Sequence, residues 1–141
     1  MMPLSRALAS RPRESTARQV ACFFVLAAVL SGCSQGPRTA RAVDEAVARE
    51  ALAAVLTTWK AGGKASELRN RTPQIVVQDM SWNNGAKLEE FEILAPCKAV
   101  DANLHCPVRL QLQNPEGKAF KKEVVYVVGT DPVITVFREL F

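Results

Sequence analysis

The longest periodic run of apolar positions lies between Val43 and Ala61. Its apolar side chains recur at three- and four-residue steps, which places them on one face of an α-helix: Val47, Ala48, Ala51, Leu52, Val55, Leu56 and Trp59. Asp44 and Glu45 occupy the first turn, where the helix dipole favours negative charge. The polar face has no excess of lysine, so the pattern predicts a helix that packs on a core rather than on a membrane.

After Gly62-Gly63 the period changes to the two-residue alternation of strands. Residues 64–70 can form one or two helical turns with Ser66 as the cap, and Asn84-Gly85 predicts a turn at 82–85. Strands are expected at 74–80, 87–99, 103–113, 118–128 and 133–137. The alternation is clearest in the third of these, where one face carries Leu104, Cys106, Val108, Leu110 and Leu112.

Turn chemistry predicts which strand residues face each other. Asn114 to Gly117 suits a three-residue loop with glycine in the left-handed conformation, which sets Leu112 opposite Phe120 and Cys106 opposite Tyr126. In the preceding hairpin, a register that pairs Cys97 with Cys106 would also set Ile93 opposite Leu110 and Phe91 opposite Leu112. The same register opposes Pro96 to Pro107, and neither proline can donate to a ladder, so a break or bulge is needed there.

The N-terminus has the composition of an export signal. Four arginines and one glutamate precede Val20–Leu30, a run of eleven residues without a charge. As a helix this run rises about 16 Å, against a hydrocarbon thickness of about 30 Å, so it is too short to span a membrane comfortably. Two other interpretations of this N-terminus are a permanent transmembrane anchor and the signal peptide of a soluble secreted protein.

The run ends in Leu30-Ser31-Gly32-Cys33, which resembles a bacterial lipobox at each position. The resemblance implies a signal peptide of residues 1–32 and a mature chain that begins at Cys33, acylated on its sulfur. More than one acyl chain gives firmer membrane binding than the marginal affinity of a single chain. Ser34 stands where lipoproteins held at an inner membrane often carry aspartate, so the resemblance favours the periplasmic face of an outer membrane if the cell has one. The polar residues 33–42 are interpreted as a tether to the domain at 43–141.

The net charge and the numbers of cysteines and histidines limit the functions and sites that the chain can have. The chain has a net charge of +4, but most of it comes from the leader, so it does not indicate nucleic-acid binding. Because Cys22 leaves with the signal and Cys33 takes lipid, Cys97 and Cys106 are left as a disulfide pair in an oxidising compartment. His105 is the single histidine, which argues against a multi-histidine metal site, and no cofactor is expected.

One long helix followed by a curved antiparallel meander of four to five strands is an α+β arrangement similar to the cystatin-like and NTF2-like folds. An enzyme of the ketosteroid-isomerase type would need an acid or base and an oxyanion donor in an apolar cavity, and Asp79 and Tyr126 are the candidates. A tyrosine among valines is more often a core aromatic, so catalysis is not expected. His105 and Cys106 point to opposite faces of a strand and cannot readily form a nucleophilic dyad.

Two charged clusters could dock a partner: Glu89, Glu90 and Glu92, and Lys118, Lys121 and Lys122. Solvated strand edges that discourage aggregation are the preferred interpretation. The sequence therefore predicts a lipid-anchored, non-catalytic binding or scaffold module that contacts the membrane through its anchor and an envelope protein through its domain. The alternative is a small-ligand-binding or enzymatic NTF2-like domain. A pocket between helix and sheet well above about 300 Å³, with convergent polar groups, would favour the alternative. A filled interior lined by Leu52, Val55, Trp59, Val108 and Leu110 would favour the module.

Overall fold

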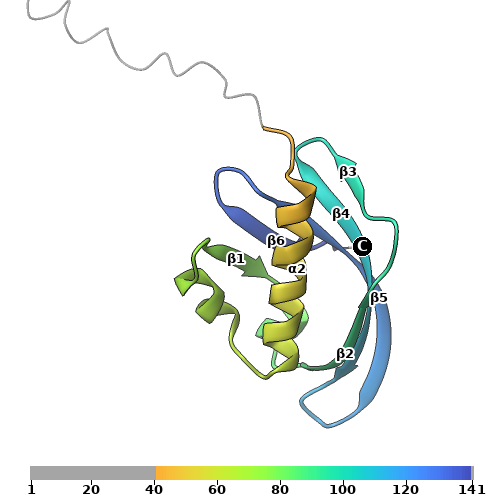
Figure 1. The fold of residues 1–141 in the computed structure, drawn as a ribbon. Helices are drawn as coiled ribbons and strands as arrows, with labels where there is room; N and C mark the ends of the chain where they lie inside the picture. The colour runs from red at the N-terminus through yellow and green to blue at the C-terminus, as the bar shows by residue number, and fades with distance from the viewer. Residues whose placement is uncertain (1–40, 141) are drawn as a thin grey trace, which may run out of the picture. The chain divides into compact units, whose positions relative to one another are not determined.

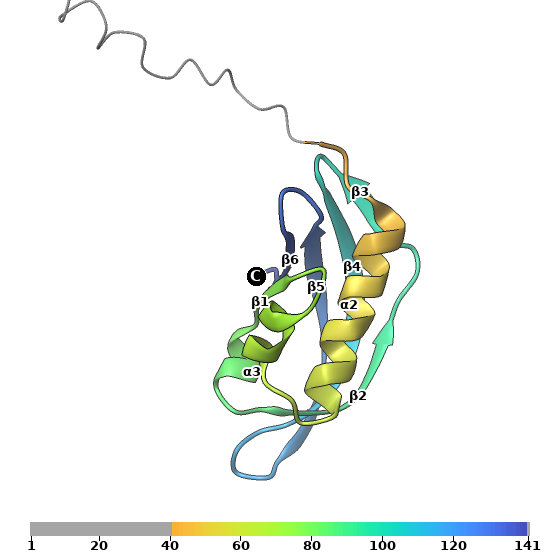
Figure 2. The same ribbon diagram turned by 60° about the vertical axis from the view of Figure 1, so that its left-hand side comes forward.

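The computed structural model describes residues 41–140, which form an α+β fold (Figure 1). The predicted signal peptide, the lipid-bearing Cys33 and the tether up to Ala40 lie outside the described residues. A curled, mostly antiparallel sheet carries helix α2 on one face, and η2, β1 and α3 lie together beside α2 (Figure 2). Between Arg41 and Leu140 no helix is long and apolar enough to cross a membrane.

Helix α2 runs from Glu45 to Lys60, inside the range that periodicity indicates. Asp44 caps its N-terminus, because the carboxylate oxygen Oδ1 accepts a hydrogen bond of 3.1 Å from the amide of Val47. Gly62, with a φ of +78°, takes the left-handed conformation that follows many helices. The buried face consists of Ala48, Ala51, Leu52, Val55, Leu56 and Trp59, while Val47 lies at its margin and is exposed.

The segment after α2 differs from expectation at two places. The 3₁₀-helix η2 spans Ala65–Asn70 and begins after Lys64 without a side-chain cap, so the predicted cap at Ser66 is wrong. The strand expected at 74–80 is shorter, since β1 spans Ile75–Gln78, and a short helix, α3, at Met80–Asn83 replaces the end of that strand and the first half of the turn expected at 82–85. The sequence signal was the carboxylate of Asp79, which caps α3 and so makes a helical turn favourable there.

The remaining strands are β2 (Lys87–Ile93), β3 (Lys98–Val100), β4 (Asn103–Gln113), β5 (Ala119–Gly129) and β6 (Ile134–Arg138). Their order in the sheet is β1-β6-β5-β4-β2, with β3 paired to β4. The sheet is therefore not the purely antiparallel meander that was expected, because β1 pairs with β6 in parallel. This pairing aligns Ile75 with Ile134 and Val77 with Val136, so that all four side chains enter the core.

The β4–β5 hairpin confirms the predicted register, with Leu112 opposite Phe120 and Cys106 opposite Tyr126. Its tip also has the predicted geometry. Gly117 has a φ of +84°, and the side chain of Asn114 accepts a hydrogen bond of 2.7 Å from the amide of Lys118. The hairpin extends beyond the C-terminal end of α2 (Figure 1).

The register predicted for β2 is wrong by two residues, since Ile93 pairs with Val108 and Phe91 with Leu110. The cause is the break that the opposed prolines require. The chain leaves the ladder after Leu94, whose amide donates to the carbonyl of Pro107 at 2.8 Å, and re-enters it as β3. Beyond the break the predicted register holds, and Cys97 and Cys106 form a disulfide with their Cα atoms 4.4 Å apart.

Candidate functional site

A buried polar cluster surrounds Asp79, which lies between β1 and α3 and is 2% exposed. Its Oδ1 accepts hydrogen bonds from the amides of Ser81 and Trp82, at 2.8 and 3.1 Å. These bonds satisfy amides that the first turn of a helix leaves without partners. The carboxylate therefore fixes the direction in which α3 starts.

Tyr126 of β5 and Arg138 of β6 reach the same carboxylate. The hydroxyl of Tyr126 donates to Oδ2 of Asp79 at 2.6 Å, and Nη2 of Arg138 lies 3.5 Å from Oδ1. Nη2 also donates to Oγ of Ser81 at 2.7 Å, while Nη1 is buried without a hydrogen-bond partner among residues 41–140. Burial, followed by the nearby charge of Asp79, raises the pKa of Tyr126 above its ordinary value, so the hydroxyl stays protonated as a donor.

The structure thus brings together the two candidates for acid–base chemistry, Asp79 and Tyr126, but directs them at each other. Both carboxylate oxygens of Asp79 already accept hydrogen bonds, and the side chains of Asp79 and Arg138 are almost fully buried. The cluster ties β1, α3, β5 and β6 together. Sequence reasoning missed Arg138, although it occupies the inward position that follows Ile134 and Val136 in the alternation of β6.

Two tryptophans lie beside this cluster. Trp59 of α2 and Trp82 of α3 stack with ring centroids 5.3 Å apart and an interplanar angle of 10°. The indole nitrogen of Trp59 donates to the carbonyl of Ala86 at 2.9 Å, and that of Trp82 donates to the carbonyl of Gly63 at 3.2 Å. Trp59 has the core-facing position that periodicity indicates, whereas nothing in the sequence pointed to Trp82 as its partner.

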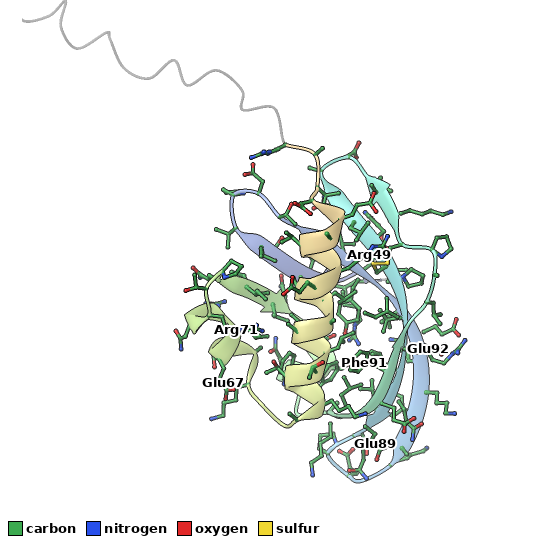
Figure 3. All side chains as sticks on the ribbon, in the orientation of Figure 1. Arg49, Glu67, Arg71, Glu89, Phe91 and Glu92 are labelled. Atoms are coloured by element: carbon green, nitrogen blue, oxygen red, sulfur yellow. A yellow bond between two sulfur atoms is a disulfide. The ribbon has the colours of Figure 1, made fainter. Side chains whose placement is uncertain are left out.

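A hollow of about 440 Å³ opens at the surface beside the tryptophan pair. It lies between the C-terminal end of α2 and the start of β2, where Figure 3 labels Glu89. The walls are Trp59, Lys60, Gly62, Gly63, Trp82, Gly85, Ala86, Lys87, Leu88, Glu89 and Gln113. Its polar lining residues, called the rim below, are two lysines, one glutamate and one glutamine: Lys60, Lys87, Glu89 and Gln113.

Part of the predicted acidic cluster finds its partners inside the sheet. Arg109 of β4 lies between Glu92 and Glu123, at 2.7 and 2.9 Å, and its hydrogen bond and charge interaction with Glu123 raise its pKa. Glu89 accepts a hydrogen bond of 3.0 Å from Gln111. These contacts support the interpretation of Glu89 and Glu92 as surface residues of a strand rather than as a free docking cluster.

His105 and Cys106, the candidates for a nucleophilic dyad, lie on opposite faces of β4. His105 is partly exposed, and Cys106 is fully buried. Among the described residues no three His, Cys, Asp or Glu side chains lie close enough to hold a metal ion.

Comparison of the chain with protein-family models, curated proteins and solved structures finds no match in any of the three.

Proposed function

We propose that this protein is a lipid-anchored component of the bacterial cell envelope, acylated at Cys33, whose domain is a non-catalytic binding or scaffold module. The support for the anchor is the lipobox resemblance of Leu30-Ser31-Gly32-Cys33 behind a short apolar run. The Cys97–Cys106 disulfide is compatible with an oxidising compartment. Ser34 favours the periplasmic face of an outer membrane.

The observation that carries the binding role is the filled interior between α2 and the sheet. The side chains that would line a central cavity are at most 2% exposed and belong to one packed cluster: Leu52, Val55, Trp59, Val108 and Leu110. Asp79 and Tyr126 use their polar atoms on each other, which suits a structural clamp better than proton transfer to a substrate. The space that remains for a partner therefore lies at the surface.

A helix across a curled, antiparallel-rich sheet also supports a distant relation to cystatin-like or NTF2-like domains. The surface hollow supports the second candidate function, binding of a small ligand, because its volume of about 440 Å³ falls within the range of ligand sites. An NTF2-like enzyme would instead place its chemistry under the helix, where this protein packs apolar side chains.

The test of the anchor is Cys33→Ser in the full-length chain. Metabolic labelling with a fatty acid should mark the wild-type protein and not the variant, and the variant should remain unprocessed before residue 33. Lipid on the variant would contradict the assignment of Cys33. Capture from solubilised envelopes with the wild-type protein then identifies partners, and partners that Cys33→Ser also captures bind the domain rather than the lipid.

A further inference from the structure

The hollow beside Trp59 and Trp82 has the features of a ligand site with an apolar floor and a polar rim. Trp82 is half-buried and lines the hollow, while Trp59, which stacks on it, is only 2% exposed. The indole nitrogens are both engaged by backbone carbonyls, so the pair offers apolar surface rather than hydrogen bonds. A flat apolar face on the ligand would match this floor.

The groups on the rim define the polar part of the ligand. Lys60 and Lys87 are exposed and form no ion pair within residues 41–140. Glu89 uses Oε2 for Gln111, and Gln113 uses Nε2 for the carbonyl of Gly117, so in the described part of the chain each keeps one oxygen that accepts no hydrogen bond. The rim thus presents donors and acceptors together, with one positive charge in excess.

We propose that this hollow binds an acidic sugar, with a pyranose ring on Trp82 and a ring-borne carboxylate held by Lys60 and Lys87. The carbon-bound hydrogens of a pyranose give the flat apolar face, and its hydroxyls both donate and accept, which satisfies Glu89 and Gln113 as well as the lysines. A single carboxylate neutralises the excess charge of the rim. This inference rests on the second candidate function above, the binding of a small ligand, and it names the chemical class of that ligand.

The fixed position of Trp82 favours such a platform. Asp79 accepts hydrogen bonds from the amides of Ser81 and Trp82, and Arg138 holds Ser81, so the buried cluster sets the place of α3. A platform that is already in place loses little conformational freedom when a ligand stacks on it. Asp79 and Arg138 act here as positioning residues that do not reach the hollow themselves.

The chain supplies its own reporter, because its two tryptophans are both in this site. Intrinsic tryptophan fluorescence of the mature protein in lipid nanodiscs is followed during titration with N-acetylmuramic acid and with N-acetylglucosamine. The two sugars share a ring and differ by the lactyl carboxylate. We expect the acidic sugar to change the emission and to bind about tenfold more tightly than the neutral one, since a charged hydrogen bond accounts for such a factor.

Lys87→Ala should lower the affinity for the acidic sugar more than that for the neutral sugar, and Lys60 should retain part of the preference. The matched control is Lys98→Ala, because Lys98 is also exposed but lies on β3, which pairs with the far end of β4. Equal affinity for the two sugars, no response to either, or tighter binding of the acidic peptide Asp-Leu-Asp would overturn the proposal. Mass spectrometry of the same sample reports the lipid on Cys33, so failure of the anchor and failure of the sugar site are distinguished.

Discussion

Replacement of Tyr126 by phenylalanine isolates one buried hydrogen bond. Tyr126 is 1% exposed, and phenylalanine fills the same volume apart from the hydroxyl, so the change opens no cavity of consequence. It removes the donor that lies 2.6 Å from Oδ2 of Asp79 and leaves that oxygen without a partner. Because the acceptor is charged and buried, Tyr126→Phe should lower the free energy of unfolding by about 1.5–3 kcal/mol at neutral pH.

The raised pKa of Tyr126 adds a pH dependence with a definite sign. Above the ordinary value of 10.0, the unfolded chain releases the phenolic proton while the folded protein keeps it. The unfolded state then binds fewer protons, so the stability of the wild-type protein should fall as the pH rises past 10.0, by up to about 1.4 kcal/mol per pH unit. Tyr126→Phe lacks this group and should show a flatter profile over the same range.

The assay is urea unfolding followed by tryptophan fluorescence at neutral and at alkaline pH. The matched control is Gln111→Ala, which removes a hydrogen bond to Glu89 at the partly exposed surface and should change stability by no more than about 0.5 kcal/mol. The buried bond to Asp79 is not formed in solution if Tyr126→Phe lowers the free energy of unfolding no more than this control does. The same conclusion holds if the wild type and Tyr126→Phe lose stability in parallel at high pH.

Two further perturbations test the core and the sheet. Trp59→Ala should cost about 3–5 kcal/mol in chemical unfolding, because Trp59 is 2% exposed, and a loss below about 1 kcal/mol would mean that α2 presents another face. Cys97 and Cys106 should resist alkylation until the protein is reduced, and reduction should cost about 2–3 kcal/mol for so short a loop. Free thiols in protein taken from the envelope would refute the bond.

Features that depend on local chemistry could be predicted from the sequence. Gly117 and Asn114 specify the turn between β4 and β5, and that turn fixes the pairing of Cys106 with Tyr126. The position of Trp59 follows from helical spacing alone. The β2 register could not be derived in the same way, because it depends on where the chain leaves the ladder between Leu94 and Cys97.

The candidate site was beyond sequence reasoning for a physical reason. Stacking of Trp59 on Trp82 requires α3 to start at Met80, and that start depends on the carboxylate of Asp79. The carboxylate is in turn held by Tyr126 and Arg138, which lie far along the chain. Alternation assigns each residue a face of its own strand but does not say which distant side chains share a buried space.

The parallel pairing of β1 with β6 affects the order in which the domain folds. In the described part of the chain, β6 is the strand that pairs with β1, so the ladder at Ile75 cannot form before Ile134 is available. Pairing between strands so far apart in the sequence forms slowly. During synthesis, which proceeds from the N-terminus, the apolar β1 stays exposed until β6 has been made. Truncation before Ile134 removes β6, so it should also release β1 from the sheet and leave Asp79 without Arg138.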